Sequence, residues 1–152
     1  MPTTWVIDPA HTDILFTATH MMVTRVRGKF TEVAGRLELD EDDPTHSRAE
    51  VTIKAASIDT GVAARDEHLR SPDFFDVATY PEITFRSTAI ERRGDSTYRV
   101  TGDLTIKDVT RHVELEVMVL GFYRSMTGSR RVGISGTTTI NREDWGLTWN
   151  VA

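Results

Sequence analysis

Apolar and polar residues alternate at every second position through most of this chain, and this pattern constrains its fold more than any other feature. Between Tyr98 and Ile106, every even-numbered position is apolar or glycine and every odd-numbered position is polar. A period of two is the repeat of a β-strand with one buried face. The same alternation recurs in residues 5–7, 14–20, 33–40, 50–55, 83–89, 112–120 and 131–140. The sequence therefore predicts about eight strands.

Turn residues separate these runs and predict antiparallel neighbours. They are Asp42-Asp43-Pro44, Arg93-Gly94-Asp95 and Lys107-Asp108. One segment differs, because Thr60 to Leu69 is rich in helix formers, with Thr60 as the expected N-cap. Ser71-Pro72 predicts a second helical start before Phe74-Phe75. We expect one all-β domain over residues 1–152, with one inserted helix.

Eight antiparallel strands with one apolar face either close into a barrel or stack as two sheets, and the alternation alone does not choose between them. Small residues are frequent on the predicted inward face. They are Ala18, Gly35, Ala55, Ala89, Gly102 and Gly136. Such an interior is underfilled and suits a small ligand. Alternatively, these residues mark bulges and bends of the strands.

The charge and composition of the chain exclude several classes of partner. The net charge is -5, and a field of this sign repels the phosphates of nucleic acid and an anionic membrane surface. There is no cysteine, and no apolar run approaches the ~20 residues that span a bilayer. We expect no nucleic-acid partner and no stable membrane insertion. Since the N-terminus shows no signal peptide, we expect a cytoplasmic protein, or a periplasmic or secreted one if such a peptide has been removed.

Residue types that usually carry catalysis or metal binding are scattered along the chain. The five histidines lack ligand spacing, which predicts that no metal is bound. The segment from Gly128 to Gly133 has the first spacing of a phosphate-binding loop but lacks its lysine. His20 ends a strand whose other inward residues are apolar. It is a core histidine bonded to a neighbour, a contact to a ligand head group, or a general base. We expect no cofactor and no enzymatic activity.

Apolar, aromatic and thioether side chains on the inward parity or near the helix are expected to line a ligand pocket; the alternative is an ordinary core. The candidate ligand-binding residues are Phe16, Ala18, His20, Met22, Phe30, Leu37, Ile53, Phe74, Phe75, Phe85 and Leu104. Arg65 and Asp66 form an ion pair that locks the helix against the sheet, or lie on a solvated helix face.

Several motifs follow one another in a fixed order along nearly the whole chain. Trp5 to Phe16 begins with W-x-I-D-x-x-H, followed by Thr12. The most distinctive block joins Ser57–Gly61, Arg65–Leu69, Phe74–Asp76 and Tyr80–Phe85; the other segments are Phe16–Met22, Val26–Phe30, Gly102–Lys107 and Asn141–Leu147. In this order the motifs resemble the YceI-like family of polyisoprenoid-binding proteins. In that family serine is usual at the position of Thr12, and glycine at that of Asp108.

This resemblance implies an eight-stranded antiparallel lipocalin-like barrel with a helix packed nearby. It also implies an elongated apolar cavity that holds a long-chain isoprenoid, such as a polyprenyl phosphate or quinone, or a related fatty ligand. A protein of this kind binds and carries or stores lipid. Two alternatives stay open, namely a stress-related protein-interaction module with a filled core and an enzyme that uses His20 on an apolar substrate. The sequence leaves open whether the chain forms a homodimer.

Overall fold

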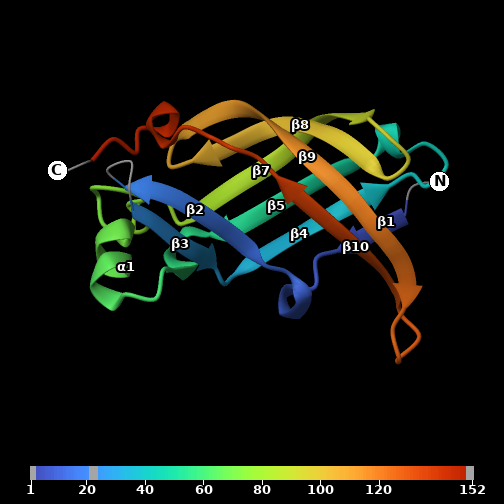
Figure 1. The fold of residues 1–152 in the computed structure, drawn as a ribbon, viewed down its shortest axis with the longest axis horizontal. Helices are drawn as coiled ribbons and strands as arrows, with labels where there is room; N and C mark the ends of the chain where they lie inside the picture. The colour runs from blue at the N-terminus through green and yellow to red at the C-terminus, as the bar shows by residue number, and fades with distance from the viewer. Residues whose placement is uncertain (1–2, 21–23, 150–152) are drawn as a thin grey trace.

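The computed structural model describes residues 3–20 and 24–149 and is dominated by β-strands (Figure 1). The strands are β1 (Thr3–Val6), β2 (Ile14–His20), β3 (Thr24–Phe30), β4 (Val33–Leu39), β5 (Arg48–Lys54), β6 (Ile58–Asp59), β7 (Glu82–Arg92), β8 (Thr97–Ile106), β9 (Val109–Arg124) and β10 (Arg130–Thr137). One α-helix, α1 (Ala63–Arg70), follows β6. Short 3-10 turns cover Pro9–His11 (η1), Pro44–His46 (η2), Ala55–Ser57 (η3) and Arg142–Trp145 (η4).

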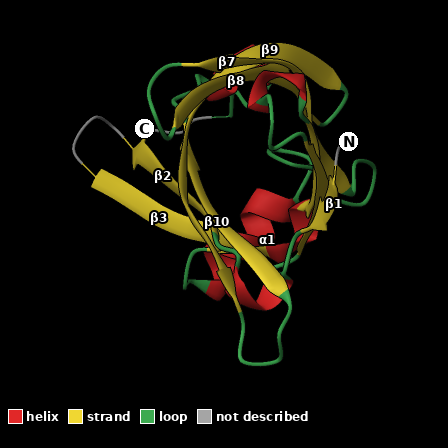
Figure 2. Cartoon of the chain, turned by 90° about the vertical axis from the view of Figure 1, so that its right-hand side faces the viewer, coloured by secondary structure: helices red, strands yellow, loops and turns green. Residues whose placement is uncertain are grey.

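Seven strands form one antiparallel sheet in the order β1-β4-β5-β7-β8-β9-β10, and β2, β3 and β6 form a second, smaller sheet. The large sheet curls strongly into a half-barrel, which Figure 2 shows as a ring of strands seen end-on. The predicted all-β, barrel-like fold with one inserted helix is confirmed. All eight predicted strands are present, and β3 and the two-residue β6 are additional.

The alternation in sequence becomes an alternation in burial. In β8, Tyr98, Val100, Gly102 and Ile106 are buried, whereas the residues between them are more exposed. Because β9 pairs with β8 in register, its inward residues lie on the same concave side; Val100 is opposite Leu115 and Tyr98 is opposite Val117. The inner face of the curled sheet is therefore apolar over most of its length.

The convex outer face carries a row of opposite charges across five adjacent strands. Arg36, Glu50, Arg86, Asp103 and His112 stand opposite one another in consecutive registers. Arg86 lies 3.5 Å from Glu50, and His112 lies 3.3 Å from Asp103. Opposite charges directly across neighbouring strands favour this register over a slipped one.

A β-bulge changes the inward parity in β7 and corrects one prediction. The pairing with β8 shifts between Ser87 and Ala89, so Ile90, and not Ala89, stands opposite Val100. Ala89 is exposed. The extra residue, Thr88, moves every later side chain of the strand to the other face.

Two local predictions around the helix were wrong. The N-cap of α1 is Val62 and not Thr60, whose hydroxyl instead bonds Asp66. Ser71-Pro72 begins a turn rather than a helix, since the amide N–H groups of both Phe74 and Asp76 donate to the carbonyl of Ser71. Asp76 then adopts a positive φ of 46°, which ends any helical path at this point.

The packed core lies at the α1 end of the half-barrel. Its buried members are Ala55, Phe74, Ile83, Ile106, Val113, Trp145 and Leu147. Trp145 in η4 is only 3% exposed, and its indole N–H donates to the carbonyl of Leu104 at 2.9 Å. A buried ring with a satisfied N–H anchors the C-terminal segment across this end of the sheet.

The small inward residues do not leave the space that the sequence suggested. A side chain at Gly102 would meet the ring of Phe85, and one at Gly35 would meet the side chain of Ile7. Neighbouring side chains therefore fill the places that these glycines leave. Among the other small residues predicted to point inward, Ala18 and Gly136 are exposed, and Ala55 is buried in η3.

Candidate functional site

The concave face has two halves that differ in how well they are packed. Toward α1, the core described above covers the sheet. Away from α1, a second set of inward apolar side chains is only partly buried. These residues, here called the open half, are Leu37, Val51, Ile90, Leu115, Val117, Val119, Val132 and Ile134. Ile134 is opposite Val119 in the sheet and is still 46% exposed.

The total accessible surface agrees with an incompletely filled interior. The chain exposes 10111 Å². A compact monomer of its mass of 17.1 kDa would expose roughly 7,800 Å². The excess of about 30% means that the chain is less compact than a typical monomer of its mass, and the partly exposed side chains of the open half contribute to it.

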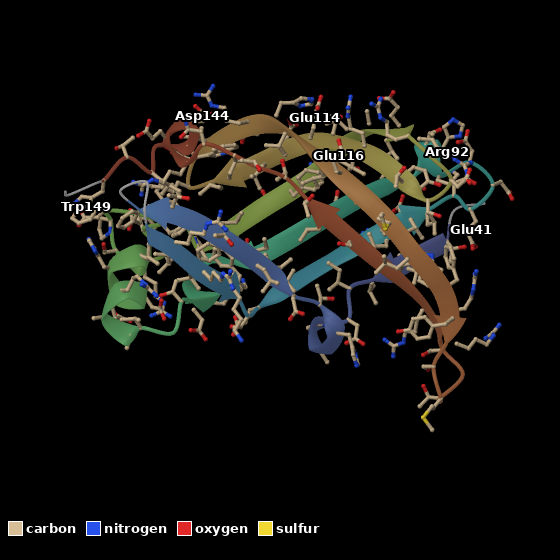
Figure 3. The ribbon with its side chains drawn as sticks, in the orientation of Figure 1. Glu41, Arg92, Glu114, Glu116, Asp144 and Trp149 are labelled. Atoms are coloured by element: carbon tan, nitrogen blue, oxygen red, sulfur yellow. The ribbon has the colours of Figure 1, made fainter. Side chains whose placement is uncertain are left out.

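An aromatic and ionic cluster stands at the far end of the open half, between the two edge strands of the large sheet. The rings of Trp5 (β1) and Phe122 (β9) lie 5.8 Å apart, edge to face. The guanidinium of Arg130 (β10) sits over both rings and donates two hydrogen bonds to Glu41. Glu41 marks this end in Figure 3, opposite the end that carries Trp149. The cluster links β10 to β1 through side chains.

Asp8 makes a second link between β10 and the segment after β1. Its carboxylate accepts hydrogen bonds from His11 at 2.8 Å and from Arg131 at 2.6 Å, and it also caps η1. The hydrogen bonds from His11 and Arg131 hold the pKa of Asp8 below its ordinary value, although partial burial raises it. The W-x-I-D motif thus supplies Trp5 and Asp8 to the two contacts that tie the edges of the sheet together.

The central motif around the helix is a clamp of hydrogen bonds. Asp66 is 7% exposed and accepts hydrogen bonds from both the amide and the hydroxyl of Thr60. Arg65 donates to the hydroxyl and the carbonyl of Thr60, so the predicted Arg65–Asp66 pair meets through a shared neighbour. Arg70 donates to the carbonyls of Ala56 and Ile58. These bonds attach α1 to β6 and hence to the sheet.

The predicted ligand-binding residues lie in three different settings. Phe30, Ile53, Phe74, Phe75, Phe85 and Leu104 belong to or pack against the core at the α1 end. Phe16 contacts Phe30, with ring centroids 5.6 Å apart, and Leu37 alone is in the open half. Ala18 is exposed; the side chain of His20 and the whole of Met22 lie outside the described residues. Whether any of these residues contacts a ligand stays a prediction.

Several residues of the open half were not singled out from the sequence. Leu115, Val117 and Val119 alternate regularly along the chain, so the sequence pattern predicts that they point inward. The pattern does not indicate which of the inward residues the core leaves uncovered. Trp5 lies in a four-residue strand. Its place beside Phe122 depends on a contact between residues more than one hundred positions apart, which no local pattern encodes.

The described histidines pair with carboxylates and not with one another. His11 lies beside Asp8 and His46 beside Asp43. His68 bonds Asp73 at 2.8 Å and packs against the rings of Phe74 and Trp149. Within residues 3–20 and 24–149, no three histidine, aspartate or glutamate side chains converge as a metal site would require.

A model of the YceI-like domain matches residues 5–152. The chain belongs to the YceI-like family. A UPF0312 protein of Pseudomonas savastanoi pv. phaseolicola is 37% identical over 149 residues, which cover 97% of this chain and 78% of that relative. A UPF0312 protein of Vibrio parahaemolyticus is 34% identical over 145 residues, covering 94% and 77%. The family resemblance expected from the motifs is thereby confirmed.

Solved structures of related proteins share the fold. BcnA of Burkholderia cenocepacia superposes with a TM-score of 0.82 at 28% identity, covering 91% of this chain and 83% of its own. The Campylobacter jejuni YceI protein gives 0.76 at 31% identity, covering 92% and 82%. A polyisoprenoid binding domain from Saccharophagus degradans gives 0.61 at 17% identity, covering 95% and 76%, a likeness of fold. In the described part of this YceI-like chain, no helix is long and apolar enough to cross a membrane.

Proposed function

We propose that this YceI-like protein binds a long apolar lipid of the polyisoprenoid class along its concave face, and that it carries or stores this lipid without chemical change. The open half carries the proposal. It presents aliphatic side chains of β4, β5, β7, β9 and β10 that the packed core leaves partly accessible, on both sides of the buried Val100 and Tyr98 of β8. A polyisoprenoid binding domain with the same fold supports the choice of ligand class.

The chemistry of the open half suits an isoprenoid tail. Leucine, valine and isoleucine side chains offer dispersion contacts and no hydrogen-bonding groups. Burying them against a hydrocarbon chain gains about 25 cal/mol for each Å² removed from water. The cluster at the far end adds a polar group, because the indole N–H of Trp5 is buried without an acceptor among the described residues. We propose that it donates to an oxygen of the ligand's head group.

A binding role without catalysis agrees with where the titratable groups lie. The side chains of His11, His46 and His112 are largely exposed, and each of them lies beside an aspartate. The row of the open half consists of aliphatic side chains. Catalysis on a tail held there would need a general acid or base within hydrogen-bonding reach of the reacting atoms.

Organic extraction of the purified protein, followed by mass spectrometry, tests the proposal. We expect close to one isoprenoid chain per protein, or saturable binding of an added polyprenol by delipidated protein. Protein that yields no lipid and binds neither polyprenol nor quinone would overturn the proposal and favour the protein-interaction module. Conversion of an added polyprenyl compound to a new product would instead identify an enzyme.

A matched pair of substitutions locates the ligand. Val117→Phe places a larger side chain on the concave face, so we expect polyprenol binding to weaken by about tenfold, or ~1.4 kcal/mol. Met118→Phe changes the next residue of β9, which is on the convex face and 47% exposed, and should leave the affinity within about twofold. Equal effects of the two substitutions would exclude the open half as the lipid site.

A further inference from the structure

The β2–β3 hairpin differs in charge from the rest of the molecule. Residues 14–30 contain Arg25, Arg27 and Lys29 and no aspartate or glutamate. The hairpin therefore carries +3, and since the whole chain carries -5, the remainder carries -8. All three cations are exposed, and no ion pair involves them in the part of the chain that the structure describes.

The three cations share one face of the hairpin. Alternate residues of a strand point to the same side, so Arg25, Arg27 and Lys29 form a row about 13 Å long. Their cross-strand partners are Thr19, Thr17 and Leu15. Leu15, opposite Lys29, is 70% exposed and adds an apolar group to the row of cations. A shallow hollow of about 380 Å³ lies on this face, lined by Leu15, Arg27, Gly28, Lys29, Asp59 and Gly61.

The opposite face of the same hairpin is apolar and packs toward the core at the α1 end. Phe16 and Phe30 lie on it, and the ring of Phe30 continues to Phe75, 5.9 Å away, at the edge of the core. Figure 2 shows β2 and β3 extending outward from the ring of the large sheet. Only β3 connects the hairpin to another strand, through β6, in the described structure. The hairpin thus has one face toward solvent with cations and one face toward the packed core.

Local charge outweighs net charge for a surface contact. At physiological ionic strength the Debye length is about 8 Å, so acidic groups on the distant convex face are screened from a surface that touches the hairpin. Asp59 stands opposite Lys29 on this face, so the three cations and this carboxylate together leave a local charge of +2, and the repulsion that the net charge predicts does not extend to it. A cation row with an exposed leucine complements an anionic lipid surface, where each lysine or arginine near the surface adds attraction.

We propose that the outer face of the β2–β3 hairpin docks this protein reversibly on an anionic lipid bilayer, from which an isoprenoid passes to the concave face. This inference rests on the proposed lipid-binding function and adds the surface from which the cargo is exchanged. The occupant is the phospholipid bilayer itself. Contact occurs through the headgroup phosphates and with shallow burial of Leu15.

Vesicle flotation tests the docking surface. The wild-type protein is mixed with vesicles of phosphatidylcholine alone, or with about 30% phosphatidylglycerol. We expect binding only to the anionic vesicles, and its loss at 0.5 M salt, where screening shortens to a few ångströms. The variant R25Q/R27Q/K29Q should partition about a hundredfold less, since each cation contributes roughly a fivefold gain near the surface.

A charge-matched control separates placement from net charge. The variant R36Q/K54Q/R86Q removes three exposed cations from the large sheet, so both triple variants carry -8. We expect the control to float with anionic vesicles nearly as wild type does. Equal loss in both variants, or wild type that ignores anionic vesicles at low salt, would overturn the docking proposal; the latter result would favour a protein partner for this face.

Polyprenol binding in detergent-free solution keeps the two proposals apart. If the hairpin variant R25Q/R27Q/K29Q binds polyprenol as wild type does but takes it from anionic vesicles much more slowly, both proposals stand. If wild type binds polyprenol in solution yet never floats, the lipid-binding function stands and the docking surface is wrong. If wild type floats but binds no lipid in solution, docking stands and the lipid-binding function fails.

Discussion

Gly102 shows how one residue controls the packing of the inner face. It is buried in β8, and a Cβ atom there would press on the carbonyl of Arg86 and the ring of Phe85. Phe85 is therefore held flat against the backbone of the neighbouring strand. The absence of a side chain at this position is a requirement of close packing and not a sign of empty space.

Gly102→Ala should destabilise the fold by about 1–3 kcal/mol, because the aromatic ring or the strand must move to admit a methyl group. Gly136→Ala is the matched control. Its Cβ would find Val117 at 3.5 Å, an ordinary contact, so we expect a change within about 0.5 kcal/mol. Urea unfolding of the three proteins measures both effects. Equal stability of the two variants would contradict this account of Phe85.

At the scale of elements, the attachment of α1 depends on the buried carboxylate of Asp66. The helix has eight residues, fewer than an isolated helix needs to be stable in water. Burial raises the pKa of Asp66, but the hydrogen bonds from Thr60 and the nearby cations Arg70 and Arg65 outweigh it, so this pKa lies below its ordinary value. The clamp therefore stabilises the folded state through an ionised group.

The contribution of this clamp should depend on pH. Because the pKa of Asp66 is lower in the folded state than the ordinary value of 3.8, its stabilisation is present above that pH and is lost as the pH falls through the folded-state pKa. Asp66→Asn should cost about 1–2 kcal/mol at pH 7 and progressively less as the pH falls below 3.8 through the folded-state pKa. Urea unfolding across this range measures it, with the exposed turn variant Asp95→Asn as control. A difference that stays constant with pH would argue against the ionised clamp.

The strands were predictable because their signal is local, and the exceptions have identifiable causes. Every run of alternating residues became a strand. The predicted strands do not include β3, although Val26, Gly28 and Phe30 alternate there with cations. The parity after Thr88 was wrong because a bulge inserts one residue without a sequence signal of its own. The two-residue β6 is defined only by its pairing with β3.

At the scale of the whole molecule, the protein has a packed end and an accessible end. The sequence indicated which residues point inward, but it did not indicate where the core would run out. That boundary depends on η4 and the turn after α1 covering one end of the sheet, through Trp145 and Phe74. Most of the predicted site residues therefore belong to the packed end, and the open half became visible only from tertiary packing.

A ligand in the open half should stabilise the whole chain. Lipid that binds only the folded state at about one hundred times its dissociation constant adds about 2.7 kcal/mol. For a domain of this size that corresponds to a rise in Tm of roughly 5–10 °C. Thermal unfolding of delipidated protein with and without polyprenol measures this shift. An unchanged Tm at saturating lipid would contradict the proposal, because a specific site binds the folded chain in preference to the unfolded chain.

The positions of the three tryptophans have an optical consequence. Trp5 stands in the aromatic cluster at the open half, whereas Trp145 and Trp149 are at the α1 end, where Trp149 contacts His68 at 4.3 Å between ring centroids. Intrinsic fluorescence thus samples both ends of the molecule at once. In a Trp5→Phe variant, only the packed end emits. The difference between the emission spectra of the wild type and this variant is the emission of Trp5. It reports the polarity around the aromatic cluster, which a bound lipid would change.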